Sequence, residues 1–176
     1  MSDLIQRSAE NLGLIRSQKP LIHNITNFVV MNYTANVLLA MGASPVMAHA
    51  EKEVEEMVSY AGALVLNIGT LSETWVRSML RAGRKCSELG TPIVLDPVGS
   101  GATSFRTETA KRIVRECRVS IIRGNSSEIL SLAGSDAKTR GVDSANEVDD
   151  AAVIGADLAS KLSCTLAITG PVDLIT

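Results

Sequence analysis

The residues best placed for chemistry follow the apolar stretch at 92–95, where the chain reaches Asp96 and then the turn Gly99-Ser100-Gly101. An apolar stretch of this kind is typical of a buried strand in a parallel sheet. Ligands of open α/β sheets bind beyond the carboxyl ends of the strands, which is where Asp96 would lie. A single Asp-Pro pair is also common in turns, so Asp96 taken alone has a structural interpretation as well.

Similar polar residues follow the other apolar stretches. Asp96 and Glu128 are suited to Mg²⁺, which prefers oxygen ligands and usually takes one or two carboxylates together with substrate phosphates. Arg123 can neutralise a phosphate, and the Thr169 hydroxyl can donate to one. Phosphoryl transfer needs such groups because it depends mostly on positioning and charge neutralisation. The predicted strand-end residues are Met47, Asn67, Asp96, Arg123, Asn125, Thr169 and Gly170.

Each of these residues also has a structural interpretation. Glu128 would lie near a helix start, where the helix dipole favours an acid in any case. Arg123 could pair with a surface acid, Thr169 could belong to an ordinary strand end, and a methionine such as Met47 is more often part of a core than of a ligand site.

Helices and strands that alternate along the chain would position these residues. Apolar periodicity and capping residues predict βαβ units, and therefore a largely parallel sheet with helices on both faces. The expected helices are 26–41, 51–60, 72–90, 107–118, 126–132 and 147–162, and the expected strands are 45–48, 63–68, 93–95, 119–122, 165–169 and 172–175. The polar stretch 134–146 is interpreted as an exposed excursion.

Composition limits the class of protein. The 176 residues fit a single α/β domain, 1–176, with 45% hydrophobic residues. A net charge of −2 argues against a nucleic-acid-binding protein. The uncharged segment 20–50 is too rich in asparagine and threonine for a membrane span and instead suggests the lining of a site for a neutral polar ligand. Three widely spaced cysteines and the absence of a signal-peptide pattern predict a cytoplasmic protein.

Six motifs in fixed order, spread over nearly the whole chain, resemble the hydroxyethylthiazole kinase family. The resemblance implies a ribokinase-like three-layer α/β/α fold and ATP-dependent, Mg²⁺-assisted phosphorylation of 4-methyl-5-(2-hydroxyethyl)thiazole in thiamine biosynthesis and salvage. It also implies a homotrimer with active sites between subunits. The motifs are Leu21-Ile22-His23-Asn24-Ile25-Thr26-Asn27, Gly42-Ala43-Ser44-Pro45-Val46-Met47-Ala48, Leu66-Asn67-Ile68-Gly69-Thr70-Leu71, Leu95-Asp96-Pro97-Val98-Gly99, Ile122-Arg123-Gly124-Asn125 and Ala167-Ile168-Thr169-Gly170.

The same resemblance suggests a role for each site residue. Met47 and Asn27 match the family's thiazole contacts, and Arg123 and Thr169 match its ATP-binding positions. Asp96 and Glu128 match the acids near Mg²⁺ and the transferred phosphate.

The resemblance also implies that the C-terminal third of the family domain does not occur in this sequence. In the family that part holds the catalytic base and a glycine-rich anion hole at a helix N-terminus. We therefore expect the chain alone to have weak activity or none. Two alternatives stay open: a thiazole-binding or assembly fragment without catalysis, and a related ribokinase-like kinase that acts on a pyrimidine or a sugar.

Overall fold

The computed structural model describes residues 2–133 and 147–176. The predicted excursion at 134–146 lies outside the described residues. Strands and helices alternate as the sequence pattern predicts, except that the first strand, at residues 21–25, is not among the expected strands. The helices are α1 (Ser2–Gln18), α2 (Met31–Met41), α3 (Val54–Tyr60), α4 (Glu73–Leu89), α5 (Ser104–Glu116), α6 (Ser126–Ala133) and α8 (Glu147–Leu162). The strands are β1 (Leu21–Ile25), β2 (Ser44–Val46), β3 (Ala63–Asn67), β4 (Ile93–Asp96), β5 (Ile121–Asn125), β6 (Thr165–Thr169) and β7 (Leu174–Ile175).

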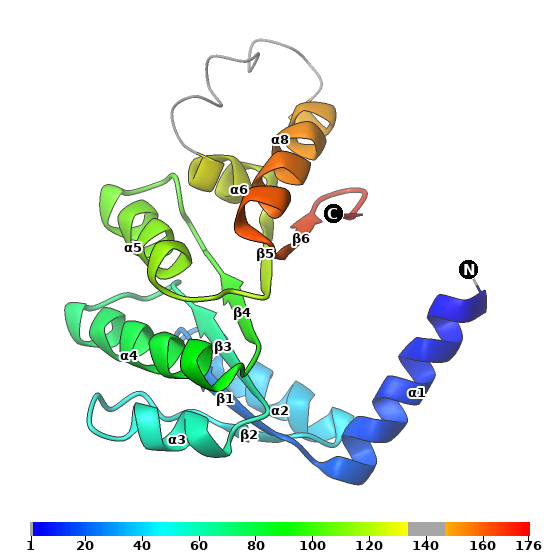
Figure 1. Cartoon of the computed structure of the whole chain (residues 1–176), viewed down its shortest axis with the longest axis vertical. Coiled ribbons are helices and arrows are strands. Elements are labelled where there is room, and N and C mark those ends of the chain that lie inside the picture. Colours follow the sequence, from blue (N-terminus) through cyan, green and yellow to red (C-terminus); the bar gives the residue numbers. More distant parts are fainter. Residues whose placement is uncertain (1, 134–146) are drawn as a thin grey trace.

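The strands form one sheet in the order β2-β1-β3-β4-β5-β6-β7. All neighbouring pairs are parallel except β6 and β7, so the predicted largely parallel sheet is confirmed. The chain moves outwards from β1 to β2 and then reverses direction towards β7. Because parallel crossovers are right-handed, this reversal puts α2 on one face of the sheet and the later helices on the other. Figure 1 shows α3, α4 and α5 side by side on that second face.

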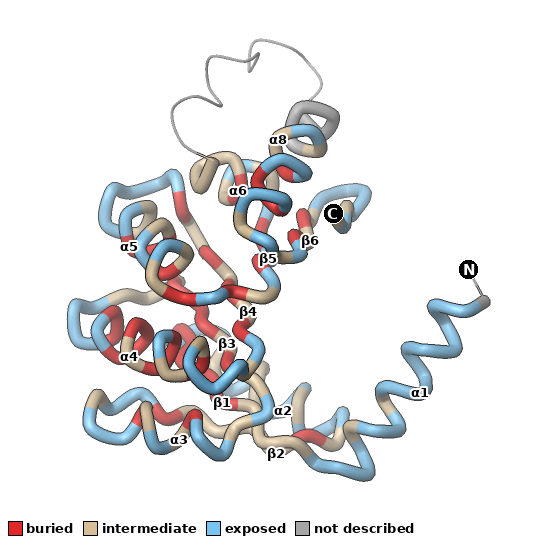
Figure 2. The backbone as a smooth tube through the Cα atoms, in the orientation of Figure 1, coloured by how far each residue is buried: buried red, intermediate tan, exposed pale blue. Residues whose placement is uncertain are grey.

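The core lies between the sheet and this row of helices. Leu64, Leu66 and Leu95 point from the strands into it and are fully buried, as are Met79 of α4 and Ile113 of α5. The apolar stripe of α4 that the sequence predicts is therefore the stripe that packs on the sheet. The buried segments of Figure 2 follow these strands and the inner sides of α4 and α5.

The opposite face of the sheet is more open. Val94 of β4 is half-buried, while Ile121 and Arg123 of β5 are exposed. Helix α2 has no buried residue. The predicted placement of helices on both faces of the sheet is confirmed, and in the described part of the chain the face that carries α2 is exposed at β4 and β5. This open face matters because the side chains of Asp96 and Arg123 emerge on it.

Several predicted boundaries move, and each shift has a local cause. Helix α2 begins at Met31, after a turn at 28–30 that Asn27 caps: its Oδ1 accepts the N–H groups of Val29 and Val30 (2.9 and 3.0 Å), and its carbonyl accepts the Met31 N–H at 3.1 Å. Helix α4 has the predicted cap at Ser72, whose side chain accepts the Trp75 N–H.

Other differences concern strand β5 and the two ends of the described chain. Strand β5 continues to Asn125 and so includes Arg123, which the sequence pattern placed beyond the strand. Helix α1 was not predicted, because it lacks an apolar stripe and is mostly exposed. None of the helices in residues 2–133 and 147–176 has the length and apolarity needed to cross a bilayer.

Candidate functional site

The predicted site residues lie along one edge of the sheet, where the parallel strands end. Asp96 and Thr169 are the last residues of β4 and β6, and Arg123 lies within β5. Met47 directly follows β2, and Asn27 lies two residues beyond β1. Glu128 is in the first turn of α6, immediately after β5. The strand order places Asp96 near the middle of this edge, with Met47 and Asn27 to one side and Arg123, Glu128 and Thr169 to the other.

Asp96 is held by neighbours from two adjacent strands. Its Oδ2 accepts a hydrogen bond from Asn67 Nδ2 at 2.8 Å, and Arg123 Nη1 lies 3.7 Å from the same oxygen. Burial raises the pKa of the Asp96 carboxyl, and Glu128 adds to the increase, while Arg123 and the Asn67 hydrogen bond oppose it. A carboxylate that is costly to ionise in the free chain would gain from a cation placed beside it.

Glu128 is engaged by the main chain. Its Oε2 accepts the Asn125 N–H at 2.9 Å, and the Asn125 Oδ1 accepts the Glu128 N–H at 2.9 Å, which makes a reciprocal helix cap. Its Oε1 accepts the Gly99 N–H at 2.8 Å. The structural interpretation of Glu128 as a helix-start acid is therefore correct, and the same carboxylate also anchors the turn that follows Asp96.

The turn after Asp96 depends on glycine. Gly99 has a φ of +72°, and a Cβ there would lie 2.1 Å from Arg106 Nη1. Arg106 in turn donates from Nη2 to the Gly69 carbonyl at 2.8 Å. The guanidinium therefore links the turn after β4 to the turn after β3, and it was not anticipated from the sequence. Arg106 directly precedes the helix expected at 107–118, and that position gives no indication that it faces the site.

Asn27 is buried, with 5% of its surface exposed, and its amide is used inside the protein. The Oδ1 accepts two main-chain N–H groups, as described above, and the Nδ2 donates to Asn67 Oδ1 at 2.7 Å. The Asn27 and Asn67 amides therefore bind each other and the main chain, and the expectation that amides of this segment line a ligand site stays a prediction. Asn67 was predicted as a strand-end residue without a role, and the structure places it between Asn27 and Asp96.

Aromatic rings connect the segment that follows Asn27 with the segment that follows Met47. The Trp75 ring lies 4.7 Å from the Phe28 ring and 4.9 Å from the His49 ring, measured between centroids. Phe28 is 69% exposed and Trp75 only 6%. This cluster offers an apolar surface next to the asparagines, at the end of the site away from Arg123.

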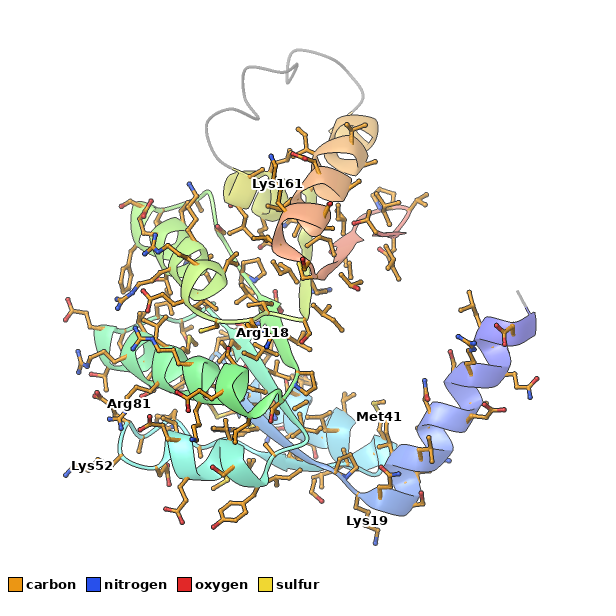
Figure 3. The ribbon with its side chains drawn as sticks, in the orientation of Figure 1. Lys19, Met41, Lys52, Arg81, Arg118 and Lys161 are labelled. Carbon is orange, nitrogen blue, oxygen red and sulfur yellow. The ribbon has the colours of Figure 1, made fainter. Side chains whose placement is uncertain are left out.

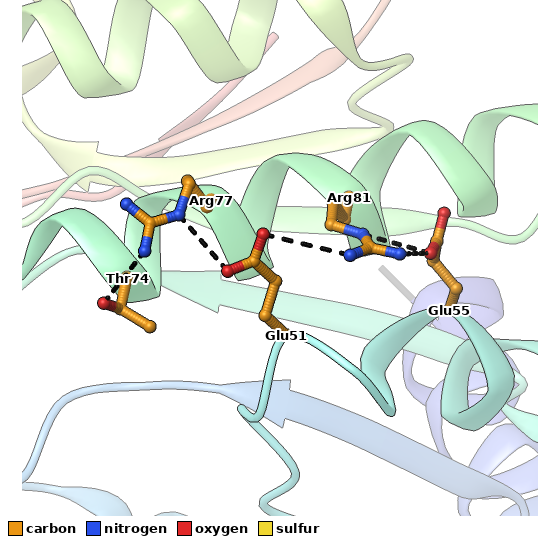
Figure 4. A network of polar contacts seen from close by, with 5 residues as sticks. All are labelled: Glu51, Glu55, Thr74, Arg77 and Arg81. Carbon is orange, nitrogen blue, oxygen red and sulfur yellow. Dashed lines mark hydrogen bonds and ion pairs between the residues drawn. The ribbon is translucent and has the colours of Figure 1, made fainter.

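Ion pairs fix the segment that follows Met47 (Figure 4). Glu51 lies 3.2 Å from Arg77 Nε and 3.8 Å from Arg81 Nη1, and Arg81 also pairs with Glu55. Arg77 and Arg81 are on α4, so the network ties the start of α3 to that helix. Such half-exposed pairs contribute little stability individually, but a network of several holds the connection after β2 in place.

Arg123 and Thr169 lie at the other end of the edge, on neighbouring strands. In the β5–β6 register Arg123 pairs with Ala167, and Asn125 pairs with Thr169. The Arg123 side chain is 54% exposed and Thr169 is half-buried, so both side chains are accessible to a ligand.

The residues present fit a magnesium ion bound together with a phosphate ligand. Residues 2–133 and 147–176 contain no group of three or more histidines, cysteines, aspartates or glutamates that could hold a metal alone. Mg²⁺ commonly uses one or two carboxylates and completes its shell with phosphate oxygens and waters. Asp96 and Glu128 supply that number, with the raised pKa of Asp96 reflecting an unfavourable free carboxylate.

A cavity of about 890 Å³ lies at the opposite edge of the sheet. Its lining includes the ends of α4, α5 and α8 and the three thiols Cys86, Cys117 and Cys164. Burial raises the pKa of Cys86 to about 12 and that of Cys117 to about 11, so these thiols are poor nucleophiles at neutral pH. None of the predicted strand-end site residues lines this cavity.

Comparisons with known protein families and with individual relatives point to the same family. The model of the hydroxyethylthiazole kinase family matches residues 12–176. A hydroxyethylthiazole kinase of Desulfotalea psychrophila is 66% identical over the whole chain, which spans 64% of that relative, and one of Chloroflexus aurantiacus is 53% identical over 98% of the chain and 64% of the relative.

Solved structures of related proteins are consistent with this family. A hydroxyethylthiazole kinase from Pyrococcus horikoshii superposes with a TM-score of 0.84 and 48% identity, over 95% of this chain and 62% of that one. An adenosine kinase from Schistosoma mansoni, in complex with adenosine and AMP, has a TM-score of 0.52 at 16% identity, covering 91% of this chain and 58% of that one. The second likeness bears on the fold alone, which is ribokinase-like. The chain thus spans less than two thirds of the length of these relatives.

Proposed function

This chain belongs to the hydroxyethylthiazole kinase family, and from that premise we propose that it supplies the substrate and nucleotide sites for ATP-dependent phosphorylation of 4-methyl-5-(2-hydroxyethyl)thiazole in thiamine biosynthesis. In this reaction the thiazole hydroxyl oxygen forms a bond to the γ-phosphorus, the bond between that phosphorus and the β–γ bridging oxygen breaks, ADP leaves, and the hydroxyl proton passes to a base. A cytoplasmic location is part of the proposal, because all three cysteines are free thiols.

The proposed roles follow the order of the residues along the sheet edge. Asp96 and Glu128 would hold Mg²⁺, which neutralises charge on the ATP phosphates when it is bound. Arg123 would pair with a phosphate, and the Thr169 hydroxyl would donate to the nucleotide. Met47 and Asn27 would line the thiazole end. The catalytic base and the anion hole are not assigned to any residue of this chain.

The observation that carries this proposal is the convergence on Asp96. A carboxylate with a raised pKa, a guanidinium 3.7 Å away and a second carboxylate in electrostatic contact is an arrangement suited to a metal-bound phosphate. The exposed pair of Lys161 with Asp157 on α8, by contrast, joins a single acid and a single base.

Transfer of the label from γ-³²P-ATP to the thiazole alcohol tests the activity directly. We expect Asp96→Asn to abolish any transfer that the chain performs, and Asp157→Asn, on exposed α8, to leave it unchanged. Release of the label as inorganic phosphate, with none on the thiazole, would contradict a thiazole kinase. Saturable binding of both ligands without any transfer would favour the alternative of binding without catalysis.

The thiazole end can be tested with the protein's own fluorophore, since Trp75 is the single tryptophan of the chain. Its contacts with Phe28 and His49 make its emission sensitive to a ligand near Met47 and Asn27. We expect the thiazole alcohol to change this emission at lower concentration than a hydroxymethylpyrimidine or a sugar alcohol. A sugar alcohol that binds more tightly than the thiazole would instead support a related kinase.

The homotrimer with sites between subunits is also part of the proposal. Support comes from a concentration of exposed apolar side chains on α1, the turn 28–30 and α2. Helix α1 extends away from the other elements, with Lys19 and Met41 near its base (Figure 3). The exposed apolar residues of this surface are Leu4, Ile5, Leu14, Phe28, Val29, Val30, Tyr33, Val37, Leu39 and Met41. Apolar surface of this extent is typical of an interface.

Sedimentation of the chain tests this association. Val37→Lys on α2, at a position 57% exposed, should lower the sedimentation coefficient towards that of a monomer. The matched change Val153→Lys on α8, at a position 74% exposed, should leave it unchanged. A monomeric parent chain at every concentration tested would exclude self-association by these residues alone.

A further inference from the structure

A chain of buried amide hydrogen bonds crosses the sheet edge from β1 to β4. Asn27 Nδ2 donates to Asn67 Oδ1 at 2.7 Å, and Asn67 Nδ2 donates to Asp96 Oδ2 at 2.8 Å. Both asparagines are almost fully buried, at 5% and 6% exposure. Buried amides of this kind are costly to leave without partners, so the three side chains hold one another in place.

The main chain sets the direction of these bonds. The Val29 and Val30 N–H groups can only donate, so they require the oxygen of the Asn27 amide and turn its nitrogen towards Asn67. The Gly69 N–H, at 3.0 Å, likewise requires the oxygen of the Asn67 amide and turns its nitrogen towards Asp96. Asp96 Oδ2 is therefore fixed as an acceptor, and rotation of the carboxylate about its own axis is restricted.

We propose that Asn67 is a positioning residue that orients the Asp96 carboxylate for its ligand and links that carboxylate to the turn at 27–30. The inference rests on the proposed function, because the ligand of Asp96 is taken to be the metal and phosphate of bound ATP. Asn67 would act through Asp96 and would not itself contact the nucleotide. With Oδ2 bonded to Asn67, Asp96 would offer its Oδ1 to a metal.

The register of the sheet supports this role. Asn67 and Asp96 are direct partners in the β3–β4 ladder, so their side chains emerge side by side on the same face. Gly69 gives the network room, because a Cβ at that position would lie 2.7 Å from Asn27 Nδ2. An asparagine that served only to end the strand would not need to join two further polar side chains.

The first test measures the orientation of Asp96 without any ligand. In the full chain labelled with ¹³C-aspartate, the Asp96 carboxyl signal is identified by its loss in Asp96→Asn. At one fixed pH we expect this signal to move in Asn67→Ala and also in Asn27→Ala, although Asn27 does not touch Asp96. Thr70→Val is the control: it removes the bond from the Phe28 N–H to the Thr70 hydroxyl in the same turn (3.1 Å) and should leave the signal in place.

The second test measures metal binding by electron paramagnetic resonance, with Mn²⁺ as the probe in the presence of ATP. Loss of a hydrogen-bonding partner of a metal ligand typically weakens metal affinity by about 10–100-fold, and we expect a decrease of that order for Asn67→Ala. Asn67→Leu, which has nearly the same shape but lacks the N–H donor and adds no charge, should weaken binding by a similar factor. The Thr70→Val control should bind as the parent does.

The outcomes separate this inference from the proposed function. An Asp96 signal that stays in place in both asparagine variants would overturn the positioning role, as would an equal effect in Thr70→Val. A parent chain that binds no Mn²⁺ with ATP would contradict the proposed function, while the carboxyl signal would still decide whether Asn67 orients Asp96. If Asn67→Ala does not fold, Asn67→Ser and Asn27→Ala provide the same comparison.

Discussion

Replacement of Gly69 by alanine should disrupt the amide network through packing alone. A Cβ at Gly69 would lie 2.7 Å from Nδ2, 3.0 Å from Cγ and 3.1 Å from Cβ of Asn27. Ordinary carbon contacts are about 3.5–4.0 Å, so the Asn27 side chain would have to move. It cannot move freely, because its amide is bonded to Val29, Val30 and Asn67.

The expected cost follows from these contacts. Overpacking of a buried site typically costs about 1–3 kcal/mol, and the loss of one or two hydrogen bonds, each worth about 0.5–1.5 kcal/mol, gives the same range. For a chain of this length, each kcal/mol corresponds to about 2–4 °C in Tm. We therefore expect Gly69→Ala to lower the melting temperature by roughly 2–12 °C.

Unfolding followed by Trp75 fluorescence provides the measurement, since the indole is buried between Phe28 and His49. Gly62→Ala is the matched control: a Cβ there would lie 3.4 Å from Pro20 Cβ, at the lower limit of ordinary contact, so Tm should change much less than in Gly69→Ala. If Gly69→Ala melts at the temperature of the parent, the close packing of Gly69 against Asn27 is wrong.

Three further predictions concern other parts of the molecule. Burial raises the pKa of Asp96, so the folded chain binds the carboxyl proton more tightly than the unfolded chain and is destabilised when Asp96 ionises. Asp96→Asn should therefore raise Tm at pH 7. This gain should shrink as the pH falls towards 3.8, the ordinary pKa of an aspartate. Burial lowers the pKa of His23, so the unfolded chain binds a proton on this imidazole more readily than the folded chain, and the free energy of unfolding decreases as the pH falls below 6.5. Measured by urea unfolding, this decrease should be smaller in His23→Gln than in the parent. A Cβ at Gly83 would lie 2.6 Å from Cys117 Sγ, so Gly83→Ala should destabilise the chain by about 1–3 kcal/mol, and the pair Gly83→Ala with Cys117→Ala should recover part of that loss in the same urea assay.

The sequence was most informative where local physics and packing agree. Helix α4 has a serine cap, an apolar stripe and Gly90 with φ +73° at its end, and its bounds match the prediction closely. Asn27 caps the turn that leads into helix α2, as the sequence predicts, but the same side chain also donates to Asn67, which is 40 residues away. Local signals identify a residue able to cap a helix but not the distant partner that it prefers.

The candidate site could likewise be predicted only in part from the sequence. The pattern of strand-end residues predicted Asp96 and its neighbours at one edge, because all parallel strands end there. It could not predict that Glu128 would be bonded to the Gly99 N–H, or that Arg106 would bridge two turns, since both contacts join segments about 30 residues apart or more. Asn67 was visible in the sequence as a polar residue at a strand end. Its role required knowledge of the register that sets it beside Asp96.

The amide network also changes how variants of Asn27 must be interpreted. Family resemblance assigns this residue to the thiazole, but its amide is bonded to the main chain and to Asn67. Asn27→Ala would therefore disturb Asp96 as well as the thiazole end, and a loss of activity could not be attributed to a lost substrate contact alone. A double-mutant cycle of Asn27→Ala with Asn67→Ala separates the two effects, since a shared path through Asn67 makes the combined loss smaller than the sum of the single losses. Additive losses would mean that Asn27 acts on the ligand independently of Asp96.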